Sequence, residues 1–377
     1  MKTFWGAIHY LSFLVGAVVL ITFLIEFVPG LPRQIRLAYL ELNGIAQHEH
    51  VDNPAYGDVP WVNDVWYQYS TQLESHWSPF VYWKSAPLSS GVLNVDDLGR
   101  RKTVHNRKPS KGKPQLQTYL FGGSTMWGWG VPDWHTVPSE LANLDNDLNL
   151  KVTNYGQLGY VSTQEYLQLF LLLRNGARPD VVVLYDGFND LHASTLDYGP
   201  GVAFSETDRI VEYAVTKREN RIKAYQIALK HAYSRSWKDA RKIADSFGLV
   251  HKREISNTDI WKLAEEAIRI YEFNINAIRT LADRYGFKPV FILQPIKGVD
   301  PKNLPEPESE ASIYQAGYRI AHEKLSKYHD VYFADDVLQG NSQYYLDNVH
   351  LTHDGNKVVA EAISKILKGQ LMKDGIR

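Results

Sequence analysis

The sequence predicts a doubly wound α/β fold, in which helices cover both faces of a parallel sheet. From residue 115 onward, strand-like segments, loops and helix-like segments alternate along the chain. The run VVVL at 181–184 is apolar at every position, as expected of a central strand buried on both faces. Hydrophobic residues make up 44% of the 377 residues and charged ones 22%, which excludes disordered and coiled-coil classes.

Five strands are expected, with helices between them. The strands cover residues 117–121, 151–155, 181–185, 289–293 and, on a weaker pattern, 331–333. One helix should begin near 136–140, one at the capping-box sequence STQE of 162–165, and a last one after Thr352. The longest should cover 257–285 and end at Gly286, because glycine readily adopts the left-handed conformation that closes a helix.

The N-terminus predicts a membrane anchor, which we place at residues 1–29. From Phe4 to Ile25 there are 22 residues without a formally charged side chain. A helix of that length is about 33 Å long, enough to cross a hydrocarbon core of about 30 Å. A cleaved signal peptide and a buried helix are the alternatives, but no small-residue cleavage site follows the apolar run. The flanking positive charges nearly balance, so an extracytoplasmic domain is expected only from the usual behaviour of signal anchors.

Residues 30–114 should form an aromatic-rich extension and a linker ahead of the main domain, 115–377. Four tryptophans in 31–112 stand among prolines and short polar runs, which indicates an irregular segment packed on the main domain. The basic, proline-containing sequence of 107–114 predicts the linker.

A basic helical insertion is expected at about 192–256, where the alternation breaks. The window 217–242 contains nine Lys and Arg residues but only two acidic residues. This is typical of a solvated helical face, although a cap that contacts anionic headgroups or polysaccharide would have the same charge. Over the whole chain the formal charge is −1, so nucleic acid is not an expected partner. The chain has no cysteine, which excludes thiolate metal sites and cysteine nucleophiles.

Two glycine-containing turns after predicted strands carry candidate functional groups, because ligands of open α/β sheets bind at the carboxyl ends of the strands. The first is the sequence FGGST, in which Gly122 and Gly123 allow a sharp turn that presents the hydroxyl of Ser124. The second is NYGQLGY at 154–160, with two glycines, Gly156 and Gly159. Each pattern alone is also typical of an ordinary loop.

Two further candidates lie at the third strand and before the last helix. Asn189, in the sequence YDGFND after the central strand, is placed to donate an amide N–H into the crevice. Asp347 precedes His350 by three residues, so its carboxylate can hold Nδ1 and leave Nε2 to accept a proton. His353 competes with His350, but it falls in the first helical turn, where an exposed structural role is expected.

Taken in order, these four blocks resemble those of the SGNH hydrolases, or GDSL esterases and lipases, over residues 115–370. The resemblance implies a three-layer, flavodoxin-like sheet of about five parallel strands. It implies Ser124 as nucleophile, with Asp347 and His350 completing a triad. The oxyanion hole would consist of the backbone N–H groups of Ser124 and Gly159 and the side chain of Asn189. Neither a metal nor an organic cofactor is implied.

This chain departs from the family pattern at two positions. The aspartate of the namesake Gly-Asp-Ser is Gly123 here, which removes a carboxylate beside the nucleophile. The proline that often follows the histidine is Leu351. Neither change removes a reacting group. For the glycine of the oxyanion hole we prefer Gly159, because it immediately precedes the segment that enters the next helix. Gly156 stays an alternative.

The expected activity is that of a serine ester hydrolase or acyltransferase acting through an acyl-enzyme. Its substrate would be an envelope glycan O-acetyl group or a lipid ester, with a slight preference for the glycan. Trp127 and Trp129 follow the nucleophile and are candidates to line the substrate crevice, as is the neighbouring Trp134, although core packing would explain one or two of these rings. The alternative is a membrane-tethered binding protein that keeps the scaffold without turnover. The oligomeric state is not indicated by the sequence.

Overall fold

The computed structural model describes residues 52–373, apart from 113, 145–147, 197, 198, 205, 207, 208 and 210–255, together with positions 16, 17 and 20. The chain divides into two compact units, and residues 52–373 as described belong to the unit formed by 51–210 and 253–377. Among the described residues, no helix is both long and apolar enough to span a membrane. Apart from positions 16, 17 and 20, the predicted anchor lies outside the described residues, as does the basic segment 217–242.

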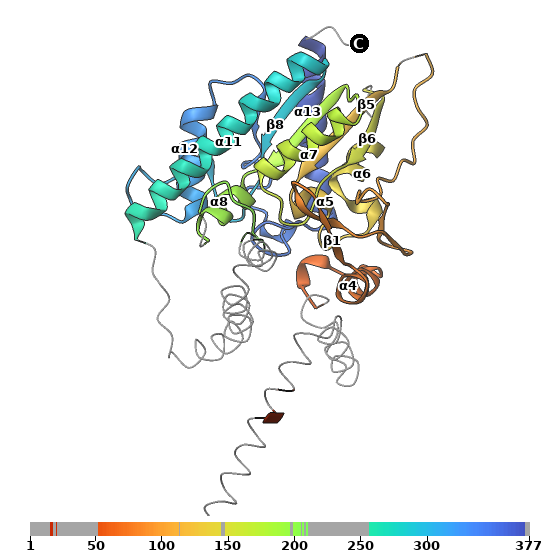
Figure 1. Cartoon of the computed structure of the whole chain (residues 1–377), viewed down its shortest axis with the longest axis horizontal. Helices are drawn as coiled ribbons and strands as arrows, with labels where there is room; N and C mark the ends of the chain where they lie inside the picture. The colour runs from red at the N-terminus through yellow and green to blue at the C-terminus, as the bar shows by residue number, and fades with distance from the viewer. Residues whose placement is uncertain are drawn as a thin grey trace, which may run out of the picture. The chain divides into compact units, whose positions relative to one another are not determined.

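A five-stranded, wholly parallel sheet forms the centre of this unit (Figure 1). Its strand order is β6-β5-β7-β8-β9, which is the flavodoxin-like order 2-1-3-4-5. The strands are β5 (Leu116–Gly122), β6 (Leu150–Asn154), β7 (Val181–Asp186), β8 (Lys288–Leu293) and β9 (Val331–Phe333). The prediction of a doubly wound sheet of about five strands is confirmed, and each predicted strand is present within one residue at either end.

Helices cover both faces of the sheet, which makes three layers. On one face α7 (Ser162–Arg174), α11 (Asn257–Tyr285) and α12 (Ile313–Leu325) pack on alternate strand residues such as Val182 and Leu184. On the other, α6 (Val137–Asn143) and α13 (His353–Lys373) pack on Val181 and Val183. All six residues of β7 are buried, because the central strand has a helical layer on each side.

Helix boundaries follow local capping chemistry in most places. Thr136 caps α6, since its side chain accepts a hydrogen bond from the backbone N–H of Ser139. Gly286, at φ 76°, ends α11 as predicted. At α7 the predicted cap was wrong: the N-cap is Val161, and Ser162 is the first helical residue because its hydroxyl is bound by Asp190. Helix α12 and the short α8 (Phe188–Ser194) were not predicted.

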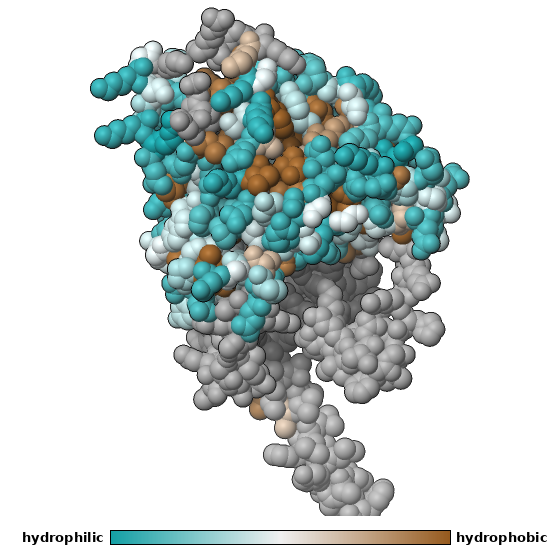
Figure 2. All heavy atoms as spheres, turned by 180° about the vertical axis from the view of Figure 1, so that it is seen from behind, coloured by the Kyte–Doolittle hydropathy of each residue, from teal (hydrophilic) through white to brown (hydrophobic). Residues whose placement is uncertain are grey.

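The segment ahead of the sheet contains more regular structure than the irregular chain predicted for 31–112. It forms the 3-10 helix η1 (Pro54–Tyr56), helix α4 (Val62–Thr71) and two antiparallel hairpins, β1–β2 (Ser75–Ser78, Tyr82–Ser85) and β3–β4 (Leu88–Ser89, Asn94–Val95). It packs on the main domain through Trp66, which is buried, and Arg101, which is fully buried. The reverse side of the molecule is largely hydrophilic around a small hydrophobic area (Figure 2), as is ordinary for a folded domain.

Candidate active site

Ser124 lies at the carboxyl end of β5, where the strand meets the four-residue helix α5 (Ser124–Trp127). A Cβ atom on Gly122 would lie 2.8 Å from the carbonyl oxygen of Tyr185 and 2.6 Å from Met126 Cβ, so only glycine fits between these neighbours. The carbonyl oxygen of Ser124 accepts hydrogen bonds from the backbone N–H groups of Gly128 and Trp129, at 2.9 and 3.0 Å. The turn therefore holds a half-buried serine at the edge of the sheet.

The loop before α13 brings a histidine and an aspartate to this serine. His350 Nε2 lies 2.7 Å from Ser124 Oγ, within the 2.6–3.2 Å expected of a hydrogen bond between nucleophile and base. His350 Nδ1 lies 2.6 Å from Asp347 Oδ2. This geometry corresponds to the tautomer in which Nδ1 carries the proton and Nε2 accepts from the serine hydroxyl. Residues that are 226 positions apart in the chain thus form one hydrogen-bonded chain.

Asp347 is fixed by its own loop as well as by the imidazole. Its Oδ1 accepts hydrogen bonds from the backbone N–H groups of Val349 and His350, both at 2.8 Å. Partial burial by itself raises the pKa of Asp347, but the hydrogen bonds from His350 and the backbone outweigh it, so the pKa is lowered overall. The carboxylate is therefore ionised at neutral pH and suited to stabilise an imidazolium.

Asn189 lies on α8 directly after β7, and its amide lies over Gly123. Its Nδ2 donates to the carbonyl oxygen of Tyr160 at 2.7 Å. A Cβ on Gly123 would lie only 2.2 Å from that nitrogen, so the missing side chain at 123 makes room for the amide. Because an amide nitrogen carries two hydrogens, the second can be donated to a ligand at Ser124.

The two glycines of the second block differ in what their backbones can do. The N–H of the buried Gly156 donates to Asn154 Oδ1 at 2.9 Å, and a Cβ there would lie 2.6 Å from the backbone nitrogen of Trp127. Gly156 is thus used for packing against α5. Gly159 is half-buried with φ 70°, next to Phe204 and directly before the carbonyl that binds Asn189. Because the N–H of Gly156 is already bonded, Gly159 stays the preferred prediction for the oxyanion glycine.

Three buried carboxyl groups, those of Glu165, Asp186 and Asp190, support the segments that carry Gly159 and Asn189. Asp190 accepts hydrogen bonds from the backbone N–H and the hydroxyl of Ser162, which fixes the start of α7 beside the Gly159 loop. Burial raises the pKa of Asp190 to about 6 and that of Asp186 to about 8, and it raises the pKa of Glu165 well above its ordinary value. Burial therefore favours the protonated, neutral form of these carboxyls.

The tryptophans that follow Ser124 have different environments. Trp127 is fully buried, with the Arg101 guanidinium 4.3 Å from its ring centroid, so the prediction that it lines the crevice was wrong. Trp129 is half-buried, with its ring centroid 5.8 Å from that of His350, which places it beside the triad. Trp134 is 36% exposed and lies near His135.

His353, the competing histidine, is half-buried rather than exposed. It stacks edge-on against Trp61 at 5.8 Å and lies 5.2 Å from the ring of His135. Burial lowers the pKa of His353, so it is largely neutral at pH 7. No hydrogen bond joins it to Ser124 among the contacts of the described residues, so the structure favours His350 over His353 as the partner of the serine.

Several positioning side chains were not assigned a role from sequence. Asn154 donates to the carbonyl oxygen of Met126 at 3.1 Å and so ties the end of β6 to α5. Gln294, at the end of β8, accepts from the hydroxyl of Thr125 at 3.0 Å. Asn154 is the last residue of β6 and Gln294 directly follows β8, so both lie at the carboxyl end of a strand, which is the signal that could have identified them.

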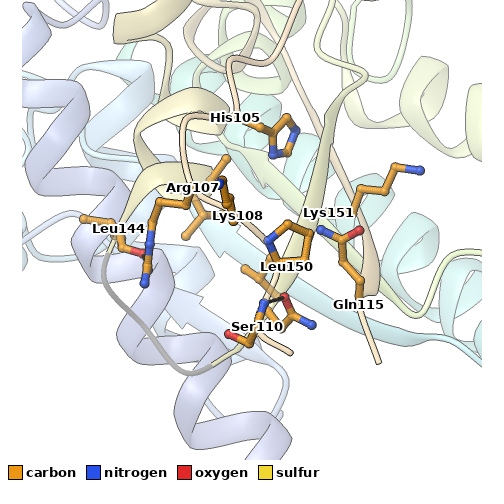
Figure 3. Close-up of a pocket in the computed structure, with 12 residues that line it drawn as sticks. His105, Arg107, Lys108, Ser110, Gln115, Leu144, Leu150 and Lys151 are labelled. Atoms are coloured by element: carbon orange, nitrogen blue, oxygen red, sulfur yellow. Dashed lines mark hydrogen bonds between the residues drawn. The ribbon is translucent and has the colours of Figure 1, made fainter. Parts of the chain in front are cut away.

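A pocket of about 210 Å³ near the sheet edge at β6 shares no residue with the groups around Ser124 (Figure 3). His105, Arg107, Lys108 and Lys151 are among its lining side chains. In Figure 3 Lys151 points away from Arg107, so these basic groups do not converge on one point.

Comparison with solved structures finds distant likenesses only. No protein-family model and no curated protein matches the chain. A member of the lipolytic G-D-S-L family from Veillonella parvula matches at 12% identity and a TM-score of 0.34, over 68% of this chain and 99% of that one. A carbohydrate acetylesterase family member from Sinorhizobium meliloti matches at 13% identity and a TM-score of 0.37, over 68% of this chain and 99% of that one. A GDSL-like lipase from Bacteroides thetaiotaomicron matches at 17% identity and a TM-score of 0.34, over 67% of this chain and 89% of that one. With likenesses this distant, the assignment of residues depends on the side chains of this chain.

Proposed function

We propose that the chain is an SGNH-type serine ester hydrolase that acts through an acyl-enzyme. The observation that carries the proposal is the hydrogen-bonded chain from Ser124 Oγ through His350 to Asp347, with the amide of Asn189 packed against the neighbouring Gly123. A nucleophile, a base and a group that orients the base are the parts that acyl transfer requires.

The first half-reaction starts with proton transfer. His350 Nε2 accepts the hydroxyl proton of Ser124 while Ser124 Oγ forms a bond to the ester carbonyl carbon. At the same time the π electrons of the carbonyl group move to its oxygen. The backbone N–H groups of Ser124 and Gly159 and the amide of Asn189 would stabilise that oxyanion. The bond to the alcohol then breaks, and the imidazolium gives its proton to the departing oxygen.

The second half-reaction returns the enzyme to its resting state. A water molecule or a sugar hydroxyl attacks the acyl-enzyme while His350 removes its proton, and the acyl–Oγ bond breaks as the imidazolium reprotonates Ser124. With water the result is hydrolysis, and with a sugar hydroxyl it is acyl transfer. Asp347 remains ionised throughout and stabilises the imidazolium.

Replacement of the nucleophile tests this proposal. Ser124→Ala should lower kcat for p-nitrophenyl acetate by several orders of magnitude while circular dichroism shows the fold to persist. Ser326→Ala, at an exposed serine after α12, is the matched control and should keep full activity. Undiminished hydrolysis by the Ser124→Ala protein would contradict the proposal.

A tethered binding protein without turnover is the competing function. A binder needs no proton relay, so the connected Ser124, His350 and Asp347 favour the enzyme. A fluorophosphonate probe separates the two: labelling of the native protein that disappears in Ser124→Ala supports the enzyme, and absence of labelling supports the binder.

For the substrate, we propose an O-acetylated glycan in preference to a lipid ester. Trp129 lies beside His350, the group that would protonate the leaving alcohol, so the alcohol part of the ester would meet an indole face. Indole faces stack on sugar rings. Trp129→Ala should therefore reduce kcat/KM for an acetylated oligosaccharide more than for p-nitrophenyl acetate, and equal losses on both would contradict the glycan assignment.

We also propose that residues 4–25 tether the domain to the extracytoplasmic face of a membrane. The support is the length and apolarity of this run in the sequence. Protease added to spheroplasts should digest the domain, and a domain left uncut would contradict this orientation.

A further inference from the structure

One segment of the extension contacts both loops that carry the proposed triad. We infer that residues 53–69, here named the clamp segment, fix the spacing between the Ser124 turn and the Asp347–His350 loop, with Asn53 and Tyr56 as positioning residues for catalysis. This inference rests on the proposed function. Neither residue touches the reacting atoms, so both act through the loops they hold.

The clamp segment binds the histidine loop through Asn53. Its Nδ2 donates to the carbonyl oxygen of Leu346 at 2.8 Å, and the two residues are 293 positions apart. Leu346 directly precedes Asp347, and its own N–H donates to the carbonyl oxygen of His350 at 2.8 Å. The Asn53 bond is therefore one residue from the group that orients the imidazole.

The same segment binds the turn after Ser124 through two phenols, of which Tyr56 is buried and Tyr69 half-buried. Tyr56 donates to the carbonyl oxygen of Gly130 at 2.8 Å and accepts from Trp66 Nε1 at 3.1 Å. Tyr69 donates to the carbonyl oxygen of Gly128 and accepts from the N–H of Gly130, both at 3.0 Å. Burial raises the pKa of both phenols, so both hydroxyls remain protonated and can donate at neutral pH.

The two loops also meet at the clamp segment. A Cβ on Gly130 would lie 2.6 Å from Leu346 Cδ1 and 2.8 Å from the Tyr56 hydroxyl, so these three groups are in close packing. Trp129, one residue earlier, packs at ring-centroid distances of 5.6 Å from Trp66 and 4.3 Å from Tyr69. The ring beside His350 is thus held from behind by α4.

Catalysis is sensitive to this spacing because the reacting groups come from separate elements. Ser124 follows β5 and His350 precedes α13, so tertiary contacts alone set the distance between Oγ and Nε2. A displacement of about 1 Å between catalytic groups can reduce the rate about 100-fold. Loss of a clamp bond should therefore lower kcat more than it changes substrate binding.

Two conservative variants test the inference. Asn53→Ser keeps a side-chain oxygen that can cap η1, as Asn53 Oδ1 does for the N–H of Ala55, but is too short to reach Leu346. Tyr56→Phe removes one hydroxyl. Each should lower kcat for p-nitrophenyl acetate about 10- to 100-fold, with KM within about twofold and a parallel fall in the rate of fluorophosphonate labelling. Tyr67→Phe, at a 47% exposed tyrosine on the same helix, should match wild type.

The outcomes separate this inference from the proposed function. If Ser124-dependent activity is present but both variants keep wild-type kcat, the clamp inference is wrong and the proposed function stands. The clamp inference is also wrong if the melting temperature of the variants falls while kcat per folded molecule does not. Asn53 and Tyr56 then have a structural role only, and the proposed function still stands. If one variant does not fold, Tyr69→Phe replaces it under the same criteria. If wild type shows neither labelling nor turnover that depends on Ser124, the proposed function fails and this inference with it.

Discussion

The oxyanion side of the site depends on the absence of a side chain at Gly123. The backbone there has a negative φ of −75°, so a left-handed conformation does not explain the glycine. The space is instead taken by the Asn189 amide, which a Cβ would approach to 2.2 Å. Where the Gly-Asp-Ser pattern has an aspartate, this chain thus has room for the amide that is proposed to bind the oxyanion.

At this scale, Gly123→Ala should displace the Asn189 amide and lower kcat about 10²- to 10³-fold, the typical effect of losing one oxyanion donor. KM and the melting temperature should change much less. Gly91→Ala is a matched control, because a Cβ there has no atom within 4 Å. Wild-type kcat in Gly123→Ala would show that the amide position does not matter.

At the scale of elements, the extension and the nucleophile turn are joined by a buried ion pair. Arg101 Nε lies 2.8 Å from Asp133 Oδ1, and both side chains are almost fully buried. Arg101 also donates to the carbonyl oxygens of Gly128 and Val131, at 2.9 and 2.8 Å. Together with its contact to the Trp127 ring at the end of α5, these three bonds of one guanidinium link the segment after the β3–β4 hairpin to the nucleophile turn.

Arg101→Met should lower the free energy of unfolding by about 3–5 kcal/mol, because it leaves the Asp133 carboxylate buried without its partner. The neighbouring Arg100→Met should cost about 0–1 kcal/mol, since the Arg100–Asp96 pair is exposed to solvent. Urea denaturation of both variants provides the measurement. Similar losses in the two variants would contradict the importance assigned to the buried pair.

Element boundaries were predicted well where a local signal decides them. The apolar run of β7, the start of a helix near 136–140 and the Gly286 stop were all read from a few adjacent residues. The cap at Ser162 was wrong because its hydroxyl is taken by Asp190, 28 positions away. Helix α12 was missed although Ser312 caps it in a capping box with Gln315, a signal present in the sequence.

At the scale of the whole molecule, the buried carboxyls make stability depend on pH. The pKa values of Asp186 and Asp190 are raised in the folded state, to about 8 and about 6, mainly by burial. The folded state therefore binds more protons than the unfolded one. The stability that this contributes is fully present below about pH 4 and is lost as the pH rises through 6 and 8.

Asp186→Asn should flatten the fall in unfolding free energy between pH 5 and pH 8, an effect on the order of a few kcal/mol, because the amide does not titrate. Denaturation in urea at several pH values measures it. Asp336→Asn, at an exposed aspartate after β9, should keep the wild-type slope. If Asp186→Asn and wild type have the same slope, the carboxyl does not change its protonation on unfolding in this range.

The sequence by itself determined the order of the strands along the chain and which reactive groups follow them, because strand pattern, glycine turns and capping residues are encoded locally. Ser124, Asn189, Asp347 and His350 could be picked out on that basis. Only the tertiary structure decided that Trp127 is core while Trp129 borders the triad, that buried carboxyls carry raised pKa values, and that α4 contacts both loops. Burial, protonation and long-range contacts depend on which distant segments pack together, and no local pattern specifies that.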